Sequence, residues 1–478
     1  MNFAMIIVVL GWVSCFNAAF LMLPALVGIF YQEQAAWAFV WSALISLAAG
    51  ILMLIRKPKK KTLYAKEGFV IVSLSWILMS VYGALPLCMS GAIPSFVDAL
   101  FEAVSGFTTT GASIVPAVEE LPKCCLFWRS FTHWIGGMGV LVFIMAFIPL
   151  SGAGNMNLMR AESPGPMVSK LVPRIKTTAF LLYAMYFGLT LLQFLCLLIA
   201  DMSVFDAVNT AFATAGTGGF GFKNDSMASC SPAIQIIITI FMILFGVNFN
   251  FYFFLLYRRF KEAFRISEVW VYFGVILASI GVITWNISSM YESLGDAARD
   301  AAFSVGSVIT TTGFATADFN LWPELSRTIL LLLMFIGACA GSTGGGIKVS
   351  RFIIMFKTMF KEIRMQIHPK LVKKVRMDGH EILHETIRAM NNYLIAYFLI
   401  FSASVLILSM ENYDFITNFS AVAATLNNIG PGLELVGPTG NFAFFSDLSK
   451  SVMIFDMLAG RLELFPVLLL FSPATWKK

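Results

Sequence analysis

The chain has 478 residues, of which 58% are hydrophobic, 14% aromatic and only 13% charged, and its mean hydropathy is +0.80. A soluble protein of this length cannot bury that much apolar surface, so the composition excludes a soluble enzyme and indicates a chain that lies in a lipid bilayer. The net charge of +6 fits Lys and Arg anchored at a lipid surface better than binding to nucleic acid.

Ten stretches are long and apolar enough to cross a bilayer, which takes about 20 helical residues. The first five lie at 4–30, 36–55, 68–90, 126–150 and 178–200, and the next five at 233–257, 269–289, 326–356, 389–410 and 451–472. The first run is full length and no basic segment precedes it, so we do not expect a cleaved signal peptide. Ten crossings would place both termini on the same side of the membrane.

The orientation follows from Lys and Arg, which gather in cytoplasmic loops. Alternate connections, together with the C-terminus, carry 26 of the 33 Lys and Arg residues, and the opposite connections carry four. Three more lie within spans or at their ends. This distribution predicts that both termini are cytoplasmic.

One segment occurs four times between spans, always on the predicted outer side. Asp98–Gly111 reads DALFEAVSGFTTTG and Asp300–Gly313 reads DAAFSVGSVITTTG. Asp206–Gly218, DAVNTAFATAGTG, appears one residue shorter, and Thr417–Gly430, TNFSAVAATLNNIG, replaces the Thr run by Asn-Asn-Ile. Each copy predicts a short helix followed by a loop, and the aspartates at the start of three copies are expected to cap these helices.

Non-helical backbone is tolerated at membrane depth only where protein shields it or where it lines water. Four such loops can meet around one axis, where glycine permits positive φ and lets carbonyl groups replace an ion's hydration shell. The C-termini of the short helices add partial negative charge toward a cation. The predicted ion-binding residues are Thr109, Thr110, Gly111, Gly216, Thr217, Gly218, Thr311, Thr312, Gly313, Asn428, Ile429 and Gly430.

The sequence therefore predicts an all-α polytopic membrane protein with ten transmembrane helices. Four repeats of helix, pore helix, filter loop and helix would surround a pseudo-fourfold pore, with an additional N-terminal pair of helices. The predicted segments are the N-terminal pair at 1–66 and the pore repeats at 67–177, 178–266, 267–388 and 389–478.

The second span of the third repeat is too long for one helix. Residues 326–356 would extend about 46 Å, against about 30 Å of hydrocarbon. The run from Gly337 to Gly346 supplies a break, because glycine disfavours helix. Lys348 is not placed as in a Walker motif, so we reject nucleotide binding there.

Three further polar features lie outside the four repeated segments. His380-Glu381-Ile-Leu-His384 matches the H-E-x-x-H motif of zinc proteases, in which both histidines share one helix face. His133 is expected to be a hydrogen-bonded packing residue. Arg461 lies midway along the last span, where an arginine costs about 2.5 to 3.5 kcal/mol, so it must face protein or water.

Over almost its whole length the chain resembles the TrkH family, the membrane subunits of bacterial Trk-type potassium uptake systems, within the Trk/Ktr/HKT superfamily. The similarity rests on the N-terminal pair of spans, on Arg160-Ala-Glu-Ser-Pro-Gly-Pro166 and on Asn427-Asn-Ile-Gly-Pro-Gly432. The second filter segment, Ala215-Gly-Thr-Gly-Gly219, departs from the other three by its additional small residues.

The resemblance implies potassium uptake across the bacterial inner membrane, with potassium as substrate and no cofactor bound by this chain. It implies that the glycine-rich break gates the pore and that Arg461 lies beneath the filter. The residues assigned to this gate are Gly341, Gly344, Gly345, Gly346, Lys348 and Arg461.

The resemblance also implies a homodimer that works with a cytosolic TrkA-type ring, which would bind a nucleotide such as NAD or ATP. The basic cytoplasmic segments Arg160–Lys176, Arg258–Arg265 and Lys357–Arg376 are candidate contacts for that ring.

Two other functions remain open from the residues. An ion-coupled secondary transporter would use protons or sodium, but its repeats are typically inverted, whereas these copies share one orientation. A membrane metalloprotease would use His380, Glu381 and His384 as its zinc site.

Overall fold

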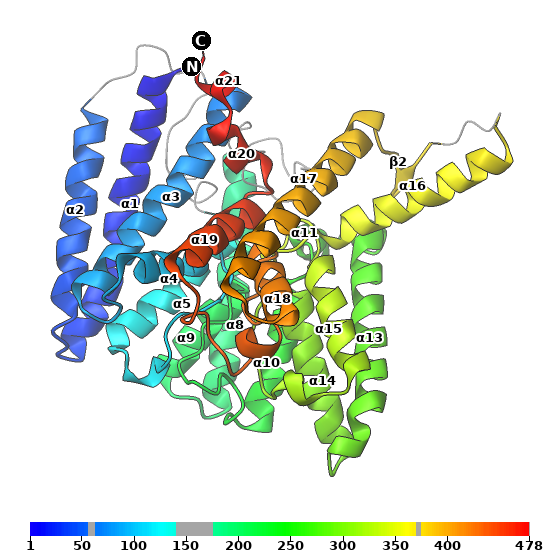
Figure 1. Ribbon diagram of the computed structural model, residues 1–478, viewed down its shortest axis with the longest axis horizontal. Helices are drawn as coiled ribbons and strands as arrows, with labels where there is room; N and C mark the ends of the chain where they lie inside the picture. The colour runs from blue at the N-terminus through cyan, green and yellow to red at the C-terminus, as the bar shows by residue number, and fades with distance from the viewer. Residues whose placement is uncertain (56–62, 140–174, 370–373, 478) are drawn as a thin grey trace.

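The computed structural model describes residues 1–55, 63–139, 175–369 and 374–477, and this part of the chain is mostly helical (Figure 1). The α-helices are α1 (Phe3–Phe30), α2 (Ala36–Leu54), α3 (Ala65–Met89), α4 (Phe96–Phe107), α5 (Lys123–Gly137), α8 (Ile175–Ile199), α9 (Val204–Ala215), α10 (Pro232–Phe245), α11 (Phe249–Leu256), α12 (Phe260–Ala263), α13 (Ser267–Ile287), α14 (Leu294–Ile309), α15 (Glu324–Ile336), α16 (Val349–Ile367), α17 (His384–Leu408), α18 (Phe415–Leu426), α19 (Asp447–Arg461), α20 (Phe465–Phe471) and α21 (Pro473–Trp476). Strands β1 (Arg376–Met377) and β2 (His380–Glu381) form an antiparallel pair.

Six helices of the described chain are long and apolar enough to cross a membrane, or seven if α10 and α11, bent by 90°, count as one span. The six spans are Phe3–Phe30, Ala36–Leu54, Ala65–Met89, Phe180–Ile199, Ser267–Met290 and His384–Glu411. Large apolar side chains point outward from them: Leu277 is 68% exposed and Trp285 and Leu406 are 72% exposed. Such surfaces suit lipid, and the chain is a membrane protein.

The other predicted spans are interrupted or incomplete in the described chain. Helix α5 ends at Gly137, shortly before the undescribed residues 140–174. Residues 337–348 separate α15 from α16, and residues 462–464 separate α19 from α20. The count of ten crossings therefore stays a prediction.

Helices α4, α9, α14 and α18 contain the four repeated segments. Ser95, Ser203, Ser293 and Asp414 cap them, each accepting a backbone N–H of the first turn. The predicted capping by Asp98, Asp206 and Asp300 is wrong, because Asp98 and Asp206 are the third residues of their helices and Asp300 lies inside α14. The true caps lie earlier in the chain, where a side chain can accept from the free N–H groups of the first turn.

Each of these short helices packs on the helix that follows the preceding repeated segment. Thus α9 contacts α5, α14 contacts α10, and α18 contacts α15. The series closes, because α4 in the N-terminal part contacts α19 near the C-terminus. The four segments are therefore arranged cyclically in chain order.

The two ends of the chain lie side by side (Figure 1). The rings of Phe3 and Trp476 stack with centroids 6.4 Å apart, and Lys66 Nζ donates a hydrogen bond of 3.0 Å to the carbonyl oxygen of Ala474. Both termini therefore lie on one face of the molecule. Helix α16 projects away from the helical body together with β2 (Figure 1).

Candidate functional site

The four short helices end in loops with one shared backbone shape. After the helix cap, the next residue is left-handed, with φ of 57° at Thr109, 53° at Thr217, 59° at Thr311 and 55° at Asn428. Two residues later a glycine has positive φ: 80° at Gly111, 78° at Gly219, 85° at Gly313 and 98° at Gly430. Positive φ strains L-residues, yet the threonines and the asparagine adopt it, so φ alone does not require glycine at the end of the loop. A Cβ atom on the terminal glycine would in addition meet a backbone oxygen of the neighbouring loop.

The second loop has the same register as the others. Gly216 caps α9, Thr217 is left-handed, and Gly219 rather than Gly218 takes the place of Gly111. The expected shortening by one residue is therefore wrong. Three glycines in four positions made the register ambiguous in the sequence, and the helix cap at Gly216 decides it.

The four glycines form a closed ring of contacts. A Cβ atom added to Gly111 would meet the carbonyl oxygen of Gly218 in the second loop, and one added to Gly219 would meet that of Thr312 in the third. In the same way Gly313 faces the carbonyl oxygen of Ile429, and Gly430 faces that of Thr110. Each loop thus touches the next, and the fourth touches the first. A cavity of about 120 Å³ opens beside the ring and is lined by all four glycines.

The glycine-rich break lies directly against this ring. Residues 337–348, hereafter the 337–348 loop, connect α15 to α16. Gly345 N–H donates to Thr311 Oγ1 at 2.6 Å, and Gly346 N–H donates to the carbonyl oxygen of Asn427 at 3.0 Å. The predicted gate and the third and fourth loops are therefore in direct contact.

The 337–348 loop is also fixed from its other side. The carbonyl oxygen of Gly341 accepts the N–H of Phe249 at 3.0 Å, at the sharp bend between α10 and α11. The buried carboxylate of Glu268 on α13 accepts the N–H groups of Ala340 at 2.7 Å and Ser350 at 3.0 Å. Glu268 was missed by sequence reasoning, although an acidic residue at the start of an apolar span was the available signal.

Arg461 ends α19 and crosses to two other elements. Its guanidinium donates to the carbonyl oxygens of Thr343 at 2.9 Å, Gly136 at 2.5 Å and Gly137 at 2.9 Å. It thereby joins the 337–348 loop to the C-terminal end of α5, where free carbonyls favour a cation.

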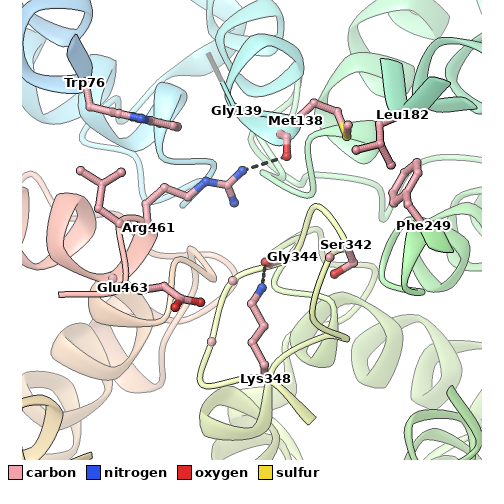
Figure 2. A pocket seen from close by; sticks show the side chains of 16 residues that line it. Trp76, Met138, Gly139, Leu182, Phe249, Ser342, Gly344, Lys348, Arg461 and Glu463 are labelled. Atoms are coloured by element: carbon pink, nitrogen blue, oxygen red, sulfur yellow. Dashed lines mark hydrogen bonds between the residues drawn. The ribbon is translucent and has the colours of Figure 1, made fainter. Parts of the chain in front are cut away.

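A second cavity, of about 90 Å³, is lined by Arg461 and by two more charged residues, Lys348 and Glu463 (Figure 2). Lys348 Nζ donates to the carbonyl oxygen of Gly344, and Glu463 pairs with Arg351 at 2.5 Å. Figure 2 shows Arg461, Lys348 and Glu463 around the 337–348 loop. All the residues assigned to the gate thus lie together at this cavity.

His133 is buried and hydrogen-bonded through both ring nitrogens. Its Nδ1 lies 2.8 Å from the carbonyl oxygen of Gly106, and its Nε2 accepts the N–H of Phe220 at 3.3 Å. The expected packing role therefore agrees with its contacts.

The H-E-x-x-H residues do not form a zinc-protease site. His380 and Glu381 lie on β2, after a turn at Asp378 and Gly379 with φ of 52° and 85°, whereas His384 begins α17. The motif is therefore not on one helix, and no group of three metal-ligating side chains occurs among the described residues. Lys374 bonds Glu381 and holds the pKa of that carboxylate below its usual value.

The Arg160–Pro166 run and most of the Arg160–Lys176 surface fall outside the described residues, as do 370–373 within Lys357–Arg376.

Comparisons with known proteins agree along the whole chain. Residues 34–478 match the model of a family described as "TrkH: Cation transport protein". The chain is 37% identical to the "Trk system potassium uptake protein TrkH" of Salmonella typhimurium and equally to that of Escherichia coli strain K12, with full coverage of each chain. It is also similar to the crystal structure of the potassium transporter TrkH from Vibrio parahaemolyticus, with a TM-score of 0.90, 33% identity and full coverage of both chains.

Proposed function

The chain belongs to the TrkH family of cation transport proteins, and on that premise we propose that it takes up potassium ions across a membrane through a pathway within the ring of four loops. One observation carries this proposal: each of the four loop glycines faces the carbonyl oxygen of the next loop, so that the ring closes. Carbonyl oxygens arranged around an axis can replace the hydration shell of a cation. Relatives named for potassium uptake support potassium as that cation.

The proposed selectivity filter consists of the last three residues of each loop. Its residues are Thr109, Thr110, Gly111, Thr217, Gly218, Gly219, Thr311, Thr312, Gly313, Asn428, Ile429 and Gly430. Gly216 is the C-cap of α9, as Thr108 is of α4, so the proposed filter includes Gly219 in place of Gly216. The C-termini of α4, α9, α14 and α18 would face the ion with their partial negative charge.

The proposed gate is the 337–348 loop together with Arg461. Gly341 and Gly346 have φ of 70° and 74°, which an α-helix cannot accommodate, and Gly344, Gly345 and Lys348 lie beside them at the same cavity. A fixed guanidinium beneath the filter raises the electrostatic barrier for a cation. Uptake would require the loop and Arg461 to separate from the carbonyl oxygens that they now contact.

We propose ten crossings and a location in the bacterial inner membrane, with both termini in the cytoplasm. The contact between Phe3 and Trp476 supports termini on one side, and the Lys and Arg distribution supports the cytoplasmic side. The proposed segments remain 1–66, 67–177, 178–266, 267–388 and 389–478.

The proposed partners are a second copy of the chain and a cytosolic TrkA-type ring that binds the regulatory nucleotide. Arg258–Arg265 and the described part of Lys357–Arg376 offer basic residues for that contact. Ion-coupled transport by protons or sodium is the second candidate, and it differs in requiring a coupling ion for each uptake event. Relatives that are transporters argue against an enzyme.

Uptake of rubidium-86 into proteoliposomes, with sodium as competitor, tests the proposal. In Gly313→Ser the new Cβ would meet the carbonyl oxygen of Ile429 and Cδ of Pro431, so we expect weaker discrimination of rubidium from sodium. Gly274→Ser is the matched control, because a Cβ there meets nothing within 4 Å. Absence of uptake by the unaltered protein, even with a cytosolic partner, would contradict potassium uptake; an unchanged Gly313→Ser would contradict the filter.

A further inference from the structure

A buried ion pair lies behind the first two loops of the ring. Arg129 Nε on α5 donates to Glu102 Oε1 on α4 at 2.7 Å, and both side chains are almost fully buried. Burying two charges costs desolvation energy, which their attraction repays only with good geometry and with further hydrogen bonds to both groups. The other contacts of the two side chains supply those hydrogen bonds.

Glu102 holds the chain that leaves the first loop. Its carboxylate accepts the hydroxyl of Ser113 at 3.0 and 3.3 Å and the N–H of Ile114 at 3.0 Å. These residues lie two and three positions after Gly111 in the sequence. The carboxylate therefore fixes the first loop just beyond its ring glycine.

Arg129 holds the chain that leaves the second loop. Its Nη1 donates to the carbonyl oxygen of Gly221 at 3.3 Å, and its guanidinium lies 4.1 Å from the centre of the Phe220 ring. His133 contacts the same Phe220, with ring centroids 4.3 Å apart. Phe220 follows the ring glycine Gly219, so the second loop is fixed at the corresponding place.

Ser113 connects the contacts of Glu102 to those of Arg129. Its hydroxyl donates to Glu102 and accepts from Arg129 Nη2 at 3.1 Å. Glu102, Arg129 and Ser113 thus form one network that sets the distance between the first and second loops. The contact between these two loops in the ring is the carbonyl oxygen of Gly218, which faces Gly111.

The third and fourth loops are supported differently. The positions that correspond to Glu102 in the other short helices are Thr210, Ser304 and Ala421, none of which can carry a charge. Beyond their ring glycines the third and fourth loops are held by single side chains of their own short helices: Ser307 donates to the carbonyl oxygen of Phe314 at 2.6 Å, Asp300 accepts the hydroxyl of Thr316 at 3.0 Å, and Ser420 accepts the N–H of Leu433 at 2.9 Å. Thr311 and Asn427 also bond to the 337–348 loop. A loop that must move to admit ions is a poor support for constant geometry, whereas an ion pair within the helix layer stays in place.

We propose that Glu102 and Arg129 are positioning residues for ion selection, which keep the first and second loops at a fixed separation while the 337–348 loop moves. The inference rests on the proposed function and adds residues that do not touch the ion. Loss of the network would widen or narrow one side of the ring, and discrimination between cations of different radius would fall.

The test compares rubidium-86 uptake and sodium competition in proteoliposomes for the unaltered protein, Glu102→Gln, Arg129→Gln, the double variant and Ser113→Ala. Ser113→Ala removes the connecting hydroxyl and leaves the charges paired. It therefore tests the network even if a variant with one unpaired charge does not fold. We expect each single variant to lose about tenfold in rubidium-over-sodium discrimination, equivalent to one charge-assisted hydrogen bond. The double variant should recover part of the lost rubidium-over-sodium discrimination, because it leaves no buried charge without its partner.

Asp296→Asn is the matched control. Asp296 lies in the first turn of α14 and pairs with Arg299 of the same helix at 2.7 Å, so its charge does not join two elements. This substitution should leave discrimination unchanged. Folded variants of Glu102, Arg129 and Ser113 that all discriminate like the unaltered protein, or an equal change in Asp296→Asn, would overturn the inference. An unaltered protein without selective uptake would instead contradict the proposed function.

Discussion

At the scale of single residues, we expect substitution of Arg461 to have the largest effect on basal ion uptake. It donates to three carbonyl oxygens on two elements and faces the cavity beside the 337–348 loop. Because these bonds hold the proposed closed state, Arg461→Gln should raise basal rubidium uptake about tenfold in proteoliposomes without partner, by loss of charge-assisted bonds and of a cation barrier.

The control for Arg461→Gln is Arg388→Gln, which removes the same charge from an exposed position at the start of α17. Equal basal uptake by the unaltered protein and Arg461→Gln, at equal protein in the vesicles, would remove Arg461 from the gate.

A second residue prediction concerns the cap of α18. Burial raises the pKa of Asp414, but bonds from the hydroxyl and N–H of Thr417 lower it by more, so the net pKa is below its usual value. The folded state thus favours the carboxylate. Its stabilisation is complete above the unfolded pKa of about 3.9 and is lost as pH falls through the lower folded pKa.

We therefore expect Asp414→Ala to destabilise the protein by about 1 kcal/mol at neutral pH. The difference in thermal midpoint between the two proteins in detergent should shrink as the pH is lowered to about 3. A difference in thermal midpoint that stays the same at every pH would show that the charge of Asp414 does not stabilise α18.

Residue roles were partly predictable from the sequence. The ring glycines Gly111, Gly313 and Gly430 follow from repeated motifs, since positive φ favours glycine. The register of the second loop could not be predicted in this way. Gly216, Gly218 and Gly219 fit the motif almost equally well until the end of α9 is known. Glu102 and Arg129 were not recognised as a pair, since their contact joins residues 27 positions apart on two helices.

At the scale of elements, the 337–348 loop depends on Glu268 of α13. Its carboxylate accepts the N–H groups of Ala340 and Ser350, one within the loop and one just after it. Glu268→Leu would leave both donors buried without this acceptor, at about 1 to 3 kcal/mol each. We expect a lower thermal midpoint and faster basal rubidium uptake.

Glu268→Gln keeps one oxygen acceptor and should fall between Glu268→Leu and the unaltered protein in both measurements. If Glu268→Leu lowers the thermal midpoint but leaves uptake at its original rate, Glu268 supports the fold and does not hold the loop closed.

Helices and breaks were predicted best where the local amino-acid composition determines them. The apolar runs identified the long helices, and the glycine content identified the break after α15. The H-E-x-x-H spacing alone is compatible with a helix, but the turn residues Asp378 and Gly379 direct the chain into a tight hairpin instead.

At the scale of the whole molecule, membrane orientation is the proposal that most needs measurement. A fusion of green fluorescent protein after residue 266, before α13, should fluoresce, because that connection is predicted to be cytoplasmic. Alkaline phosphatase fused after residue 292, between α13 and α14, should be active, since that connection is predicted to lie outside. The reverse pair of results would invert the topology and place the Lys- and Arg-rich loops outside.

The cyclic order of the molecule follows from long-range contacts that a sequence read alone does not contain. Motif similarity predicted four corresponding but unequal loops, and which loop neighbours which depends on the packing of α9 on α5, α14 on α10 and α18 on α15. The resemblance to a known family gave the general architecture, and the asymmetric support of the loops comes from individual side chains.

The closure of the ring by α4 and α19 has a consequence for biosynthesis. As the ribosome delivers the chain, α4 enters the membrane early, yet its partner α19 is synthesised more than three hundred residues later. Until then the carbonyl oxygen of Thr110 lacks the glycine that faces it, Gly430. A prematurely terminated chain thus cannot assemble a selective ion path, and nascent or truncated copies would not discharge the cell's potassium gradient through one.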